Sequence, residues 1–235
     1  MNNNSLQHIV ESASEQGHTL EIISTIKSGK EAEVFAAELD GTIVALKVYK
    51  DPEQRTFRNA KEYVVGKYYK KPSERKAVAK GNAFSKKLLH SNWVEREFFL
   101  LKKLYSLGAI LPEPLLLLGN AICMEYLGTK DSVAPRLCDV ELTQEEMKGA
   151  LKSILESISI FWEAGIVHAD LSEFNILWHK DSPYIIDFPQ AINRKTHPST
   201  EVFLERDLKN ILHFFGKKLG INLDIEAYKQ DIIEA

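Results

Sequence analysis

The sequence is poor in cysteine, in long apolar runs and in targeting signals. Its two cysteines, Cys123 and Cys138, are too few for a disulfide framework and lack metal-ligand spacing, so we expect reduced thiols. The longest apolar run, 110–123, is interrupted by proline, glycine and polar residues, and no run approaches the roughly 20 residues of a membrane span. The first twenty residues lack the basic and apolar regions of a secretory signal. These absences predict a cytoplasmic protein with no membrane partner.

The composition is that of an ordinary folded protein, with 44% hydrophobic and 27% charged residues. A chain of 235 residues can bury a sizeable core, and it fits one two-lobed unit better than two independent domains. The net charge of -3 hides an asymmetry, because residues 50–90 carry twelve Lys/Arg against four Asp/Glu. A region so rich in positive charge favours phosphate-bearing partners.

Apolar patterns predict strands in the first half of the chain and mostly helices in the second. Asp40-Gly41 lies between two alternating runs and predicts a tight hairpin. Thr143, followed three residues later by Glu146, predicts a capping box at a helix start, and Gly108 follows the end of another helical pattern. The predicted strands are 20–26, 34–39, 43–49, 115–118, 121–126, 176–178 and 184–186, and the predicted helices are 5–16, 92–107, 143–164 and most of 200–234.

Two segments in the second half carry the pattern of a phosphotransferase. The loop HADLSEFN places Asp170 and Asn175 five residues apart, between a predicted helix and a predicted strand. Phosphoryl transfer from ATP needs a carboxylate to orient the attacking hydroxyl and accept its proton, and oxygen ligands for Mg²⁺. Asp170 fits the first role and Asn175 the second. Asp187, at the end of the next apolar strand, completes a metal pair with Asn175. Either segment alone is weak evidence, because solvated loop acids and a helix-capping asparagine are the competing interpretation. Together, in this order and with a strand between them, the two segments favour phosphoryl transfer.

A single lysine lies within the apolar strand pattern Ala45-Leu46-Lys47-Val48. A lysine that faces the interior needs a charge partner. In the kinase scheme such a lysine holds the α- and β-phosphates and pairs with a glutamate of the following helix. We choose Glu97, with Glu95 as the alternative, because leucines behind Glu97 continue the apolar face. The competing interpretation is a strand-edge lysine that points to water.

Two further segments occupy positions where a kinase binds nucleotide. Residues 28–32 (SGKEA) join the first two strands but contain one glycine, so in isolation they predict an ordinary β-turn. Placed ahead of Lys47, their N–H groups and the Ser28 hydroxyl suit phosphate contacts. Residues 124–128 (MEYLG) suit the hinge that binds adenine, or a plain strand end. The candidate nucleotide-binding residues are Ser28, Gly29, Lys30, Ala45, Lys47, Glu97, Met124, Glu125 and Leu127, and the candidate catalytic residues are Lys47, Asp170 and Asp187.

Taken together, SGKEA, ALKVYK, WVERE, MEYLG, HADLSEFNIL and IDFPQ resemble the RIO family of atypical serine/threonine protein kinases. The resemblance spans about residues 20–215 and leaves the branch of the family open. It implies an α+β, two-lobed protein-kinase-like fold with a β-rich N-lobe and a mainly helical C-lobe. The C-lobe is expected to be trimmed, because Pro189-Gln190 follows Asp187-Phe188 and no A-P-E motif comes after them. The expected divisions are an extension at 1–19, an N-lobe at 20–127 with a basic insertion at 51–90, and a C-lobe at 128–235.

The resemblance also implies ATP and Mg²⁺, with Mn²⁺ as an alternative, and phosphorylation of serine or threonine on a protein or on the chain itself. It further implies ATPase cycling through a phosphate on Asp187 and a link to maturation of the small ribosomal subunit. Residues 50–90 would then contact ribosomal RNA or a pre-ribosomal particle, although a solvated charged loop explains their charge more simply. Two alternatives stay open: a small-molecule kinase of the aminoglycoside or choline type, and a non-catalytic nucleotide-binding scaffold.

Overall fold

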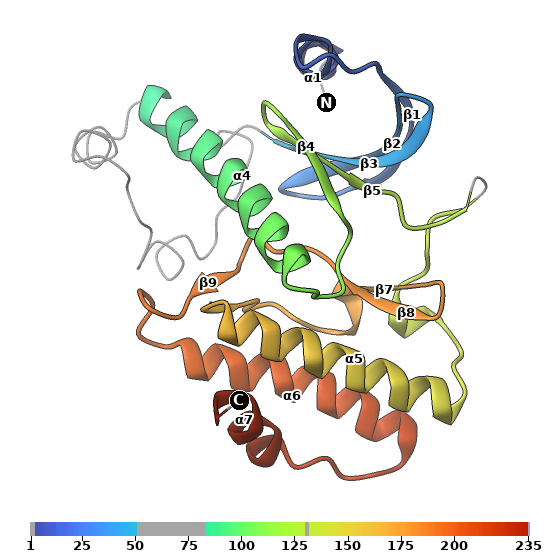
Figure 1. The fold of residues 1–235 in the computed structure, drawn as a ribbon, viewed down its shortest axis with the longest axis vertical. Helices are drawn as coiled ribbons and strands as arrows, with labels where there is room; N and C mark the ends of the chain where they lie inside the picture. The colour runs from blue at the N-terminus through green and yellow to red at the C-terminus, as the bar shows by residue number, and fades with distance from the viewer. Residues whose placement is uncertain (1–2, 51–82, 130–131, 235) are drawn as a thin grey trace. The chain divides into compact units, whose positions relative to one another are not determined.

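The computed structural model describes residues 3–50, 83–129 and 132–234, whose helices and strands are drawn in Figure 1. These residues form two compact units. The first contains residues 3–50, 83–102 and 113–126, and the second contains 103–112 and the described residues from 127 onward. Residues 51–82, most of the predicted basic insertion, lie outside the described part of the chain.

The first unit contains a five-stranded antiparallel sheet in the order β1-β2-β3-β5-β4. The predicted hairpin is confirmed, because Asp40 and Gly41 turn between β2 and β3 with φ of 50° and 83°. Two consecutive positive φ angles are the signature of the turn whose twist matches a hairpin. The strands are β1 (Leu20–Ser28), β2 (Ala32–Leu39), β3 (Thr42–Tyr49), β4 (Pro114–Leu118) and β5 (Ala121–Glu125).

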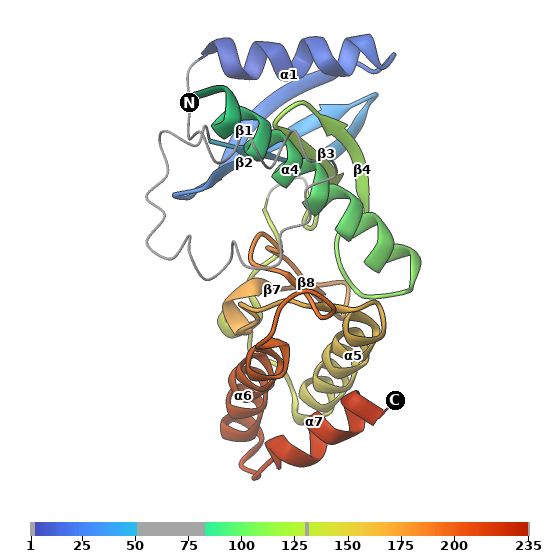
Figure 2. The ribbon, with the colours of Figure 1, turned by 90° about the vertical axis from the view of Figure 1, so that its left-hand side faces the viewer.

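Helix α1 (Asn3–Glu15) covers part of this sheet, as Figure 2 shows. Its Ile9 and Ala13 are fully buried in one cluster with Val44, Leu46 and Cys123 of the strands. The predicted N-terminal helix is therefore confirmed, and its apolar stripe explains its position. Each fully buried aliphatic side chain of this kind stabilises the fold by roughly 1.5–3 kcal/mol.

Helix α4 (Ala83–Ser106) is longer than the sequence pattern indicated. Its end before Gly108 is confirmed, but the predicted start at Asn92 was wrong, because the helix begins at Ala83. The extra turns contain lysine and leucine, which have high helix propensity, although their apolar spacing is irregular. Periodicity therefore located the helix from Asn92 onward and missed the turns that precede it.

The second unit is mainly helical, with two small sheets in which β6 pairs with β9 and β7 pairs with β8. The predicted capping box is confirmed, since Thr143 accepts a hydrogen bond from the Glu146 N–H and the Glu146 side chain accepts one from the Thr143 N–H. Gly220, with φ of 69°, ends α6. The elements are η2 (Leu137–Asp139), α5 (Gln144–Glu163), β6 (Ile166–Val167), η3 (Glu173–Asn175), β7 (Ile176–His179), β8 (Ser182–Ile185), β9 (Ile192–Asn193), α6 (Thr200–Leu219) and α7 (Ile225–Glu234).

Buried side chains of α5 and α6, among them Ile154, Phe161, Leu208 and Phe215, form the core of this unit. The predicted α+β class of a kinase-like fold, with a β-rich first part and a mainly helical second part, is confirmed. None of the helices in the described part of the chain is both long and apolar enough to cross a membrane.

Candidate active site

Lys47 pairs with its predicted partner, Glu97, in the first unit. The Lys47 Nζ lies 3.0 Å from Oε1 of Glu97 on α4. Both side chains are largely buried, with 13% of the Lys47 side chain and 3% of the Glu97 side chain exposed. Tyr49, two residues along β3, is buried beside them, and the Lys47 Nζ lies 5.2 Å from the centre of its ring. Burial, followed by the negative charge of Glu97, raises the pKa of the Tyr49 phenol well above its usual value. The lysine therefore faces the interior and has the counter-charge that burial requires.

A double-mutant cycle tests this ion pair. Replacing Glu97 by Gln or Lys47 by Met alone removes one partner of a largely buried ion pair, which costs about 3–5 kcal/mol of unfolding free energy. We expect the loss in the double variant to be smaller than the sum of the two single losses, because the interaction between the two charges is counted in both single variants. Urea denaturation of the four proteins measures the coupling. Additive losses would show that the pair is not coupled in solution.

The 28–32 loop is held by its own contacts. The Gly29 N–H donates to the Ala32 carbonyl at 2.9 Å, and the Lys50 Nζ donates to the Gly29 carbonyl at 2.8 Å. Lys50 also lies 3.2 Å from the Glu33 carboxylate, to which the Ser28 hydroxyl donates at 3.3 Å. The Ser28 hydroxyl is thus already engaged. Lys30 is exposed.

The segment predicted as a hinge follows β5. Ala45 pairs with Met124 between β3 and β5, and both are half-buried. The Glu125 N–H donates to the Glu113 carbonyl at 2.8 Å, which completes the pairing with the chain before β4. Leu127 is buried, and its carbonyl accepts from the Ala134 N–H at 2.9 Å. The Leu127 carbonyl is therefore engaged within the protein, and the predicted adenine contacts, the Glu125 carbonyl and the Leu127 N–H, stay predictions.

The HADLSEFN loop of the second unit presents Asp170 as an exposed carboxylate between buried neighbours. Ala169 adopts φ of 63°, a left-handed conformation that costs a non-glycine residue about 1–2 kcal/mol. Asn175 donates from Nδ2 to the Asp170 carbonyl at 2.8 Å. This bond uses the amide nitrogen of Asn175 and leaves Oδ1 as the atom able to bind a cation.

Asp187 follows β8 and is exposed, with φ of 70°. Its neighbours on both sides are anchored. Ile186 donates its N–H to the Asn175 carbonyl at 2.9 Å and accepts from Nε2 of His168 at 3.2 Å. Phe188 is buried with its ring centre 4.6 Å from that of His168. The strained conformation is thus held from both sides, as is usual for residues that carry function.

The charges in this loop interact. Desolvation, then the negative charge of Asp187, raise the pKa of Asp170, whereas the Arg206 charge and a hydrogen bond with Asn175 lower it. Two carboxylates that repel each other beside an amide oxygen suit a divalent cation. Among the described residues, no three His, Cys, Asp or Glu side chains form a metal cluster. Asn175 and Asp187 offer the amide and carboxylate oxygens that a hard divalent cation prefers.

Sequence reasoning missed three residues of α6 that hold the loop. Asp207 is buried and accepts from the N–H groups of Ala169 at 2.7 Å and Leu171 at 3.0 Å. Arg206 donates to the Ala169 carbonyl, and Asn210 donates to the Leu171 carbonyl at 3.0 Å. A signal was present, because Asp207 interrupts the buried stripe of a predicted helix. A carboxylate at such a position must satisfy backbone or charged partners.

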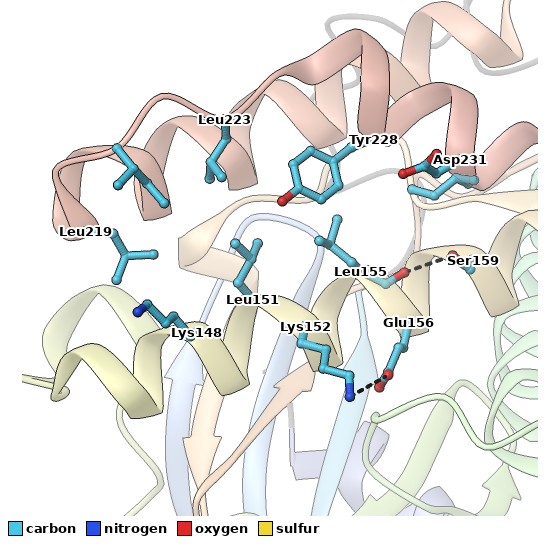
Figure 3. Close-up of a pocket in the computed structure, with 12 residues that line it drawn as sticks. Lys148, Leu151, Lys152, Leu155, Glu156, Ser159, Leu219, Leu223, Tyr228 and Asp231 are labelled. Atoms are coloured by element: carbon cyan, nitrogen blue, oxygen red, sulfur yellow. Dashed lines mark hydrogen bonds and ion pairs between the residues drawn. The ribbon is translucent and has the colours of Figure 1, made fainter.

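A cavity of about 560 Å³ lies elsewhere in the second unit, between α5 and α7. Figure 3 shows Tyr228 of α7 above Leu155 of α5 across this space. None of the predicted site residues lines it, so it is separate from the loop that carries Asp170. Its lining is Lys148, Leu151, Lys152, Leu155, Glu156, Ser159, Leu219, Ile221, Leu223, Tyr228, Asp231 and Ile232.

Comparison with known proteins places the chain in a family. A family model described as the RIO domain matches residues 33–228. The chain belongs to the RIO family. This RIO domain covers both β3 with Lys47 and the loops with Asp170, Asn175 and Asp187, so the family resemblance predicted from the motifs is confirmed.

The similar relatives are named as kinases. Serine/threonine-protein kinase RIO1 of Caenorhabditis elegans is 33% identical over 213 residues, which are 88% of this chain and 39% of the relative. Serine/threonine-protein kinase rio1 of Schizosaccharomyces pombe is 35% identical over 209 residues, which are 86% of this chain and 39% of the relative. RIO-type serine/threonine-protein kinase Rio1 of Thermoplasma acidophilum is 34% identical over 204 residues, which are 85% of this chain and 98% of the relative. This RIO chain thus spans about two fifths of the eukaryotic relatives and nearly all of the archaeal one.

Proposed function

We propose that this RIO-family chain is an ATP-dependent serine/threonine kinase in which Asp170 orients the acceptor hydroxyl and receives its proton. The observation that carries the proposal is the exposed Asp170 carboxylate, on a loop that Asp207 fixes through the N–H groups on either side. A general base needs a fixed position and access to the substrate, and Asp170 is exposed on a loop that is fixed on both sides. The names of the relatives support serine or threonine as the acceptor.

In the proposed step, the acceptor oxygen bonds to the γ-phosphorus of ATP while the bond to ADP breaks, and the hydroxyl proton passes to Asp170. Lys47, oriented by Glu97, would bind the α- and β-phosphates. Asn175 and Asp187 would hold Mg²⁺, with Mn²⁺ as the alternative, and the bound cation neutralises phosphate charge. Ser28, Gly29, Lys30, Ala45, Met124, Glu125 and Leu127 complete the proposed nucleotide site.

The physiological context is part of the same proposal. The acceptor is a protein or the chain itself, and ATPase cycling through a phosphate on Asp187 is the variant of the reaction in which water is the final acceptor. A role in small ribosomal subunit maturation, with ribosomal RNA or a pre-ribosomal particle bound by residues 50–90, stays a prediction, since residues 51–82 lie outside the described ones. A cytoplasmic location is likewise a prediction.

A transfer assay tests the proposal. The purified chain is incubated with γ-labelled ATP and Mg²⁺, alone, with a serine-rich protein and with an aminoglycoside. We expect label in phosphoserine or phosphothreonine and its loss when EDTA removes the metal. Label in the aminoglycoside would instead identify a small-molecule kinase. ATP binding without any turnover would identify a nucleotide-binding scaffold and contradict the kinase assignment.

A further inference from the structure

Arg206 on α6 is exposed and yet held in place. Its guanidinium donates to the carbonyl of Ala169, the residue before the proposed base, and packs 4.8 Å from the centre of the Phe203 ring. A guanidinium carries five N–H donors in a planar fork. One of these donors contacts Ala169, and the residue as a whole is exposed to solvent. Arg206 is therefore a preorganised cation at the edge of the catalytic loop.

The loop itself is acidic. HADLSEFN contains Asp170 and Glu173 and no lysine or arginine, and Asp187 adds a third carboxylate nearby. Arg206 lies close to this group, because its guanidinium donates to the carbonyl of Ala169, the residue directly before Asp170. An anionic group on a protein substrate would be repelled by these carboxylates unless it bound at Arg206. Arg206 thus offers such a group a favourable position beside Asp170.

An apolar side chain lies next to this cation. Val202 precedes Arg206 by four residues, so the two lie one turn apart on the same face of α6. Val202 is 67% exposed, the largest exposed fraction among the large apolar side chains in the described part of the chain. A surface that offers a cation and an apolar contact one helical turn apart suits a short extended peptide better than a small polar molecule.

We propose that Arg206 and Val202 form an acceptor-recognition surface, which binds a protein segment carrying an anionic side chain close to its phosphorylated serine and an apolar side chain beyond it. The inference rests on the proposed kinase function and adds the substrate class to it. The anion is a carboxylate or a phosphoserine, since an arginine fork binds both. In this arrangement Arg206 selects the segment and Asp170 acts on its hydroxyl.

Peptide binding without ATP tests the inference separately from catalysis. Four fluorescently labelled peptides share one leucine and an alanine in place of the acceptor serine. They differ at one position, two residues from that alanine, which is glutamate, phosphoserine, alanine or lysine. By fluorescence anisotropy we expect the glutamate and phosphoserine peptides to bind about tenfold more tightly than the alanine peptide, as charge-assisted hydrogen bonds allow. Phosphoserine binding much more tightly than glutamate would identify a phosphorylated segment as the partner. Equal binding of all four peptides would overturn the inference.

Charge reversal separates recognition from a structural role. Arg206→Glu should transfer the preference from the glutamate peptide to the lysine peptide, whereas loss of a loop contact alone would weaken all peptides equally and contradict the inference. Arg194→Glu is the matched control, because the Arg194 guanidinium is also exposed and also packs on an aromatic ring, 4.4 Å from the centre of Trp162. It should leave the preference unchanged. Peptide selectivity without phosphate transfer would support the surface and count against the kinase function, so the two failures are distinguishable.

Discussion

Asp170→Asn is expected to lower the rate of phosphate transfer about 10²–10⁴-fold, the usual contribution of a general base. The asparagine side chain has nearly the same shape but cannot accept the hydroxyl proton. Because Asp170 is exposed and its neighbours are fixed through backbone groups, the fold should not change. Steady-state kinetics with labelled ATP, together with the thermal midpoint of unfolding, measures both effects.

Glu173→Gln is the matched control for this prediction. Glu173 is a carboxylate of the same loop, in η3, and no catalytic role is assigned to it. The variant should keep a rate close to that of the unaltered protein. If Asp170→Asn retained full activity, another group would have to accept the proton, and the assignment of the active site would be wrong.

Asp207→Asn is expected to lower both activity and stability, although Asp207 lies on α6 and not in the loop. An asparagine has one acceptor oxygen, so one of the two N–H groups of Ala169 and Leu171 loses its partner. A buried donor without a partner costs about 1–3 kcal/mol. A displacement of the loop by about 1 Å would lower the rate roughly 10²-fold. Urea denaturation and the transfer assay measure the two losses.

The loss of stability caused by Asp207→Asn should become smaller as the pH rises. Burial, as the largest cause, raises the pKa of Asp207 from 3.8 to about 7. The native state then holds its proton more tightly than the unfolded chain, so this contribution to stability is complete below pH 3.8 and is lost as the pH rises through about 7. Asparagine does not titrate. We therefore expect the difference in unfolding free energy between the unaltered protein and the Asp207→Asn variant to shrink from pH 5 to pH 8.

Asp231→Asn provides the control for this pH dependence, because it makes the same chemical change at an exposed position on α7. Because Asp207 is intact in this variant, the pH dependence that Asp207 confers should persist. A slope that persisted in Asp207→Asn would show that another group is responsible for the dependence.

Much of the fold could be predicted from local pattern. The hairpin at Asp40-Gly41, the cap at Thr143 and the strand that carries Lys47 are each specified by a few adjacent residues. The same holds for the two loops with Asp170 and Asp187, whose residue types suit the proposed chemistry. The pairing of Lys47 with Glu97 followed from a physical need, since a buried ammonium requires a counter-charge.

The remainder depends on contacts between distant segments. Three residues of α6 bind a loop more than thirty residues earlier in the chain: Arg206, Asp207 and Asn210. The sequence around them does not indicate which segment they contact. The two-residue strands β6 and β9 were missed because so short a segment has no periodicity to detect. Likewise, α4 begins at Ala83 because its first turns follow helix propensity rather than an apolar stripe.

The two backbone bonds to Asp207 have a further consequence for the time scale on which the loop opens. An amide proton exchanges with solvent only when its hydrogen bond breaks, and these acceptors belong to a buried side chain of a core helix. The amides of Ala169 and Leu171 should therefore exchange slowly, at the rate set by opening of α6, although Asp170 between them is exposed. Hydrogen–deuterium exchange at these two positions would then report in a single measurement whether the whole helical unit is folded.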